Sequence, residues 1–365
     1  MLRDSSLLLY SRNISGSRNI EERLLLREAI DRFSSRLPSG WSVSLDVLEG
    51  GPWDARATVT SPEGRSVDLA VEAKKNLTPL AARELVRRYQ TSNQSGAGLL
   101  VTAPFIGPVA REILVDARVG LVDVTGNIRV EISSPGLFIE CHGADRDPKP
   151  GEISLRTLRG ESASRVVRTL IECSDPGTVR DIARRARTDP GHVSRILQFM
   201  AEQDLIRRSK RGSLLDVRWP SLLRRWATDA PLEARAEARP YLAPRGLTVV
   251  QRKLVDVRLR YAVTGSLAAS RKLAIAPARL AMIYVEAPAD VSKALDLREA
   301  ETGANVLLLV PKDELVFERR EEDDGVYYAH VVQVAADLLT GPGRSPSEGE
   351  ELISWLQDHE GVWRE

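Results

Sequence analysis

Two stretches rich in proline, glycine and charge divide the chain, and they limit what the segments between them can fold into. The first runs from Gly143 to Gly151 and the second from Asp229 to Arg245. Stretches of this composition are typical of linkers. They leave segments of roughly 145, 80 and 125 residues, each of the size of a domain. We therefore expect three domains, at residues 1–145, 152–228 and 240–365.

The composition favours a folded chain in a reducing compartment. Hydrophobic residues make up 42% and charged residues 28% of the chain, which excludes a disordered tail. No apolar run approaches the roughly 20 residues that span a bilayer, so we expect no membrane contact. The two cysteines, Cys141 and Cys173, form neither a disulfide framework nor a CxxC zinc motif. We expect a cytoplasmic location.

The first segment predicts a mixed sheet with helices on its faces. Apolar residues recur at helical spacing in residues 20–36, and three alternating strands follow. The expected order of the remaining elements is helix, strand, helix and three strands. The expected strands are 41–47, 54–60, 67–73, 98–102, 120–124, 128–132 and 137–141, and the expected helices after the first are 79–90 and 108–117.

Three residues of this segment suit phosphodiester chemistry. Asp54 opens the second strand, while Glu72 and Lys74 end the third, where alternation places them on one face. Two carboxylates can hold Mg²⁺, and an ammonium can stabilise developing charge. The pattern resembles the PD-(D/E)xK restriction-endonuclease-like superfamily over residues 20–140. The resemblance implies an Mg²⁺-dependent nuclease with Asp54 and Glu72 as metal ligands.

Two questions about this motif stay open. Pro52-Trp53-Asp54 departs from the family's Pro-Asp, and either Glu28 or Gln90 could complete the site. The same charged residues also fit solvated strand ends in an inactive, nuclease-like domain.

The run from Gly120 to Asn127 resembles a segment of large bacterial regulators that carry such a domain before a winged helix. Its alternative interpretation is a tight hairpin turn at Gly126-Asn127.

The middle segment is strongly basic. Residues 156–225 hold 16 Arg and Lys against 8 Asp and Glu, although the whole chain has a net charge of +1. Helices are expected at 164–172, 179–186 and 190–203, with Thr178 as an N-cap, followed by a basic hairpin at 205–219. This order, with its turn lengths and caps, resembles a winged helix-turn-helix.

The resemblance implies binding of double-stranded DNA through the third helix and the hairpin. Arg195 could pair with guanine and Gln198 with adenine in the major groove. A symmetric operator would require a homodimer. Winged helices also serve as dimerisation or docking modules, and that alternative stays open. The expected DNA-contacting residues are Thr178, Arg180, His192, Ser194, Arg195, Gln198, Arg207, Arg208, Lys210 and Arg211.

The last segment contains a strand followed by Thr264-Gly265-Ser266, which resembles the nucleotidyltransferase-like fold. The next strand offers only Glu286 where catalysis needs a carboxylate pair, so we expect no nucleotidyl transfer. Together with the helical ending, residues 160–358 resemble AbiEi-like antitoxins of type IV toxin–antitoxin systems and related transcriptional regulators. A winged helix behind a nuclease-like domain departs from that family. The resemblance implies that a protein partner could bind the C-terminal domain.

These observations predict an α/β and α+β multidomain protein. Its expected parts are a restriction-endonuclease-like mixed sheet, a winged helix-turn-helix and a nucleotidyltransferase-like α/β domain. The favoured function is a non-enzymatic, sequence-specific DNA-binding regulator, with an autoregulatory antitoxin as a subtype. The alternatives are an Mg²⁺-dependent endonuclease targeted by its winged helix, and a protein-interaction scaffold. No cofactor is expected, except Mg²⁺ if the nuclease-like site is active.

Overall fold

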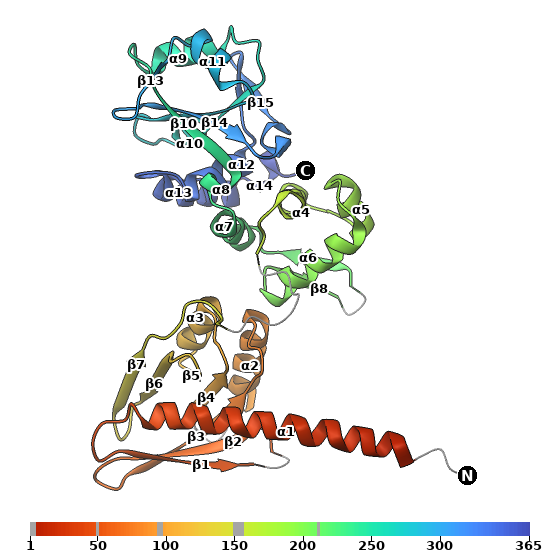
Figure 1. The fold of residues 1–365 in the computed structure, drawn as a ribbon, viewed down its shortest axis with the longest axis vertical. Helices are drawn as coiled ribbons and strands as arrows, with labels where there is room; N and C mark the ends of the chain where they lie inside the picture. Colours follow the sequence, from red (N-terminus) through yellow and green to blue (C-terminus); the bar gives the residue numbers. More distant parts are fainter. Residues whose placement is uncertain (1–4, 49–50, 93–97, 149–156, 210–211) are drawn as a thin grey trace. The chain divides into compact units, whose positions relative to one another are not determined.

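A computed structural model describes residues 5–48, 51–92, 98–148, 157–209 and 212–365 (Figure 1). The chain forms two compact units. The first comprises residues 1–153 with 202–204, and the second comprises residues 154–201 with 205–365. Both units mix helices and strands, which confirms the expected α/β class. No helix within the described ranges is both long and apolar enough to cross a membrane.

The first unit is built on a seven-stranded sheet whose strands lie in chain order. The first three strands pair antiparallel, the third to fifth run parallel, and the fifth to seventh pair antiparallel again. All seven strands match the expected ones closely. They are β1 (Ser42–Val47), β2 (Ala55–Thr60), β3 (Ser66–Ala73), β4 (Gly98–Ala103), β5 (Gly120–Asp123), β6 (Ile128–Ile132) and β7 (Leu137–Cys141).

Helices cover both faces of this sheet (Figure 1). Helix α1 (Ser5–Ser34) packs its apolar stripe, including Leu26 and Phe33, against one face. Helices α2 (Pro79–Ser92) and α3 (Pro108–Asp116) pack against the other. Leu100 of β4 belongs to the first core, whereas its neighbours Leu99 and Val101 belong to the second. This alternation is what a strand buried on both faces requires. Helix α1 begins at Ser5, earlier than the expected start at residue 20, which is where its apolar stripe starts.

The second unit begins with helices and a small hairpin and continues into another seven-stranded sheet. That sheet has the order β13-β10-β14-β12-β11-β16-β15. The early elements are α4 (Glu161–Glu172), α5 (Val179–Arg185), α6 (Pro190–Glu202), β8 (Ile206–Arg208), β9 (Leu214–Val217), α7 (Trp219–Asp229) and α8 (Leu232–Arg235). The later elements are β10 (Ala236–Leu242), α9 (Leu247–Leu254), β11 (Tyr261–Thr264), α10 (Gly265–Ala269), β12 (Ala281–Val285), α11 (Pro288–Ala294), β13 (Arg298–Glu299), β14 (Val306–Pro311), the 3-10 helix η1 (Glu314–Phe317), β15 (Glu321–Asp323), β16 (Val326–Tyr328), α12 (Val331–Leu339), α13 (Ser345–Asp358) and α14 (Glu360–Trp363).

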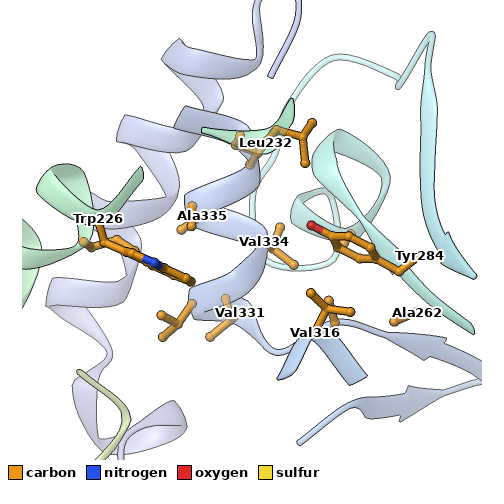
Figure 2. Packing of buried hydrophobic residues seen from close by; sticks show 14 of the residues in the cluster. Trp226, Leu232, Ala262, Tyr284, Val316, Val331, Val334 and Ala335 are labelled. Carbon is orange, nitrogen blue, oxygen red and sulfur yellow. The ribbon is translucent and has the colours of Figure 1, made fainter. Parts of the chain in front are cut away.

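One hydrophobic core runs through the second unit. It extends from Leu158 to Trp363 and includes residues of both expected segments. Helix α12 lies at its centre, where Val331 and Val334 pack among side chains of α7, α8, β11, β12 and η1 (Figure 2). The expected second and third domains therefore lie within a single compact unit, and the boundary proposed between them at residues 228–240 stays a prediction.

The interpretation of residues 229–245 as a linker is wrong. This stretch contains α8 and β10, and β10 pairs along its length with β14. The carbonyl of Pro240 accepts a hydrogen bond from the N–H of Ala300, next to the short strand β13. In a strand, the nitrogen and carbonyl of one residue point to the same side, so the proline nitrogen also faces β13. Pro240 can therefore occupy β10. Because β10 pairs with β13 over only two residues, the N–H that proline lacks does not interrupt the longer pairing of β10 with β14. The other expected linker, from Gly143 to Gly151, falls within residues 1–153 of the first unit, and its residues after 148 lie outside the described ranges.

Candidate functional site

The helix pair α5 and α6 is fixed by caps at both helix starts. Thr178 and Asp181 form a capping box, in which the Thr178 oxygen accepts from the Asp181 N–H at 3.3 Å and the Asp181 carboxylate accepts from the Thr178 N–H at 3.0 Å. Hydrogen bonds from Thr178 lower the pKa of Asp181. At the start of α6, the carboxylate of Asp189 accepts the N–H of His192 at 3.0 Å. The turn between the two helices is therefore built as the sequence predicted.

Helix α6 has one buried face and one exposed polar face. Val193, Ile196 and Met200 are buried, as the apolar spacing predicted. Ser194, Arg195 and Gln198 are exposed, whereas His192 is half-buried beside the helix start. The exposed side chains can reach a partner without disturbing the core.

The hairpin of β8 and β9 adds basic side chains beside these helices in sequence. Arg207 is exposed and lies 3.5 Å from the carboxylate of Asp216. Arg208 is half-buried, and its Nε donates to the carbonyl of Gly212 at 3.1 Å, which holds the turn. Arg180 is exposed at the start of α5. Two of the expected hairpin contacts, Lys210 and Arg211, lie outside the described residues.

In the first unit, the structure brings the three expected nuclease-like residues together. The Oδ2 atom of Asp54 accepts the N–H of Ala73 at 2.8 Å, which ties the start of β2 to the end of β3. Glu72 is buried, and its Oε1 lies 2.6 Å from Nζ of Lys74. The guanidinium of Arg88, on α2, lies 2.7 Å from the same oxygen. A buried carboxylate is thus paired with two cations.

The sequence reasoning missed a fourth member of this cluster, Glu22 of α1. Burial raises the pKa of Glu22, and so do the charge of Asp54 and a hydrogen bond with it. Glu28, one of the two expected partners, is instead exposed and paired with Arg32 at 3.4 Å. Gln90, the other, is exposed. The missed signal is the helical period, because residue 22 continues the stripe of Leu25, Leu26 and Ala29, and residue 28 does not.

The cluster offers oxygen ligands of the kind that Mg²⁺ prefers, but they are engaged in protein contacts. Glu72 pairs with Lys74 and Arg88, and Asp54 accepts a backbone bond. No group of three metal-ligating side chains within the described residues is placed to hold an ion. A divalent cation would have to replace the contacts of the two basic side chains with Glu72.

The segment from Gly120 to Asn127 has a structural role in this unit. Asp123 is fully buried, and its carboxylate accepts five hydrogen bonds. The donors are the backbone of Ile106, Thr125 and Asn127 and the side chains of the latter two, at 2.7–3.0 Å. This arrangement supports the interpretation of Gly126-Asn127 as a turn between β5 and β6.

The Gly-Ser turn of the second unit is closed by side chains. A side chain on Gly265, which has φ of +67°, would meet Met282, and the hydroxyl of Ser266 donates to Glu348. Thr264 donates to the buried carboxylate of Asp337 at 2.7 Å. Glu286 is exposed and paired with Arg260 at 2.9 Å. These contacts hold the turn against α12 and α13 and leave Glu286 outside it.

Comparison of the chain with protein-family models, with curated proteins and with solved structures finds no match. The function is therefore argued from the geometry of the two candidate sites. One is the exposed polar and basic surface of α5, α6 and the hairpin. The other is the carboxylate cluster around Glu72.

Proposed function

We propose that this chain is a sequence-specific regulator that binds double-stranded DNA through α4–α6 and the β8–β9 hairpin, which together act as a winged helix-turn-helix. The observation that carries the proposal is the exposed polar face of α6, with Ser194, Arg195 and Gln198 opposite a buried apolar face. This face lies in the segment of the chain with the largest excess of basic residues.

The chemistry of these side chains fits the grooves of DNA. A helix of this kind enters the major groove and presents its exposed residues to base edges. Arg195 would read guanine through two hydrogen bonds, and Gln198 would read adenine in the same way. Arg180 and Arg207, which are exposed, would contact phosphates and supply affinity without sequence preference. Lys210 and Arg211 are proposed as further hairpin contacts.

The regulatory role extends this proposal. A symmetric operator would be read by a homodimer, and autoregulation in the manner of an antitoxin would place that operator upstream of the protein's own gene. The sheet of the second unit, continuous with the same core, would then present a surface to a protein partner.

A gel-shift series on that upstream DNA tests the proposal, with Mg²⁺ and with EDTA. We expect a discrete shifted band with intact DNA, competed only by the same sequence. Arg195→Ala should lose the preference for that sequence. The matched control is Arg239→Ala, because Arg239 is exposed on β10 and pairs with Glu237 at 3.0 Å. Equal binding to all sequences, unchanged in Arg195→Ala, would contradict the proposal.

A second candidate function is Mg²⁺-dependent DNA cleavage by the first unit, in the manner of PD-(D/E)xK nucleases. The observation that favours it is the convergence of Glu22, Asp54 and Glu72 around Lys74. Within the described residues no three ligating side chains are placed to hold an ion, so Mg²⁺ could bind only if Glu72 exchanged its contacts with Lys74 and Arg88 for the metal. A metal held there would polarise the phosphodiester and activate water. Lys74 would stabilise negative charge on the phosphate. The winged helix would then deliver the cluster to its target.

A further inference from the structure

The second unit contains a polar cavity of about 550 Å³. Side chains of α4 and α5 line one part of it, and η1, the residues after it and Glu365 line the rest. The cavity therefore lies between the helices that precede α6 and the sheet-containing part of the unit. Its size falls within the range of about 300–1,000 Å³ typical of small-molecule sites.

Arg168 of α4 lines this cavity and has an unsatisfied donor. Its side chain is 2% exposed. Its Nε donates to Glu172, and one terminal nitrogen donates to the carbonyl of Leu315 at 2.7 Å. The other terminal nitrogen has no hydrogen-bond partner among the described residues. A buried, charged donor without an acceptor is costly. Because this nitrogen has almost no accessible surface, a shift of the side chain towards the cavity would be needed to bring it to an acceptor there.

Two other arginines of the cavity already have carboxylate partners. Arg165 pairs with Asp313 at 2.8 Å and with Glu318 at 3.0 Å. Arg319 pairs with Glu172 and with Glu365, each at 2.9 Å. These contacts hold the walls together across the cavity, and Glu172 is shared between Arg319 and Arg168.

Arg185 of α5 differs from those two. It is exposed at the cavity, and one of its terminal nitrogens donates to the backbone carbonyl of Asp175 at 3.1 Å. Leu315 is the one large aliphatic residue of the lining, and the lining surface is more polar than apolar. Arg185, whose side chain is exposed, and Arg168, which has one terminal nitrogen without a partner among the described residues, are thus the lining cations that we expect to donate to an incoming oxyanion.

We propose that this cavity binds a small polar molecule that carries a carboxylate or phosphate group, with Arg168 and Arg185 as its principal anchors. Arginine suits both groups because its planar fork donates two parallel hydrogen bonds to their oxygens. Such a ligand would bridge α4 and α5. Its effect on DNA affinity rests on the proposed function, since α5 leads directly into α6, whereas the binding itself does not.

Isothermal titration calorimetry on the full chain, without DNA, tests the site. The probes are inorganic phosphate, pyrophosphate and citrate, each titrated at matched ionic strength. We expect saturable heat with at least one probe, and the comparison of citrate with the phosphates shows which oxyanion is preferred. Arg185→Gln should weaken that binding about tenfold or more, because it removes charged hydrogen bonds. The matched control is Arg184→Gln, since Arg184 is the neighbouring exposed arginine, pairs with Asp181 and is not a lining residue.

Two results would overturn the proposal: no saturable binding of any probe, or equal losses in Arg184→Gln and Arg185→Gln. The second would mean general attraction to a basic surface. Arg168→Gln should reduce binding further, with circular dichroism to verify its fold, and if that variant does not fold, Arg185→Gln still decides the question. Probe binding that leaves DNA affinity unchanged would keep the site and remove only its regulatory effect.

Discussion

The carboxyl group of Glu22, on α1, is hydrogen-bonded to the carboxyl group of Asp54 at the start of β2. Burial raises the pKa of Glu22, and the neighbouring negative charge of Asp54 raises it further. The negative charge of Asp54 therefore disfavours ionisation of Glu22, and a cation beside the pair would relieve that repulsion. This pair is therefore the part of the cluster from which divalent-cation binding is most readily tested.

If the second candidate function holds, the wild-type chain will nick supercoiled plasmid in Mg²⁺ or Mn²⁺ and not in EDTA. Lys74→Ala should abolish nicking. Glu22→Gln should weaken the affinity for the divalent cation by about 10- to 100-fold, because it removes one negative charge from the cluster. The matched control, Glu28→Gln, changes an exposed glutamate of the same helix and should leave nicking intact. Nicking that survives Lys74→Ala would reject this function.

The DNA-binding proposal predicts different results for the helix and the hairpin. Arg195→Ala should cost about 1–3 kcal/mol on the preferred sequence and relax discrimination at one base pair. Arg207→Ala should weaken binding to all sequences and reduce the salt-dependence slope by about 1. Fluorescence anisotropy on specific and random duplexes over a range of salt concentrations measures both effects. Parallel losses in the two variants would contradict the assignment of base contact to α6.

The capping box gives a prediction for stability. Thr178→Ala removes the oxygen that accepts the Asp181 N–H, so the free energy of unfolding should fall by about 1 kcal/mol in urea titrations. Thr178→Ser keeps the oxygen and should retain most of that stability. If both variants were equally destabilised, the methyl group of Thr178 rather than the cap would be responsible.

His330 predicts a specific dependence of stability on pH. Burial lowers its pKa to about 4, although the charge of Glu172 opposes the shift. The unfolded chain takes up a proton on this histidine below about pH 6.5, whereas the folded chain does so only near pH 4. The contribution is fully present above about pH 6.5 and is lost as the pH falls towards 4. The loss is of the order of 3 kcal/mol.

Urea denaturation at several pH values measures this dependence. His330→Asn should flatten the stability profile between pH 4 and 6.5 while keeping an acceptor for the cap of α12, where the Val332 N–H lies 3.4 Å from Nδ1 of His330. His359→Asn is the control, because His359 is exposed and stacks on Trp355. An unchanged slope in His330→Asn would show that other groups cause the acid sensitivity.

Local sequence patterns determined much of the fold. Alternation and helical spacing located the strands of the first unit and the buried face of α6, because those patterns depend on neighbouring residues alone. The caps at Thr178 and Asp189 were also readable, since a cap uses atoms within three residues. The same patterns gave Asp54, Glu72 and Lys74 as one cluster, because strand alternation and the order of elements were enough to bring them together.

Contacts between distant elements were decided only by the tertiary structure. Glu22 belongs to the cluster because α1 packs its apolar stripe over the sheet, and Glu22, which continues that stripe, then lies beside Asp54. Pro240 entered a strand because its neighbour β13 is short, which a proline-rich composition does not reveal. The cavity at Arg168 exists because η1 packs against α4, more than 140 residues away in sequence. The sequence by itself specifies local conformation and the chemistry available, whereas burial and long-range packing decide which side chains meet.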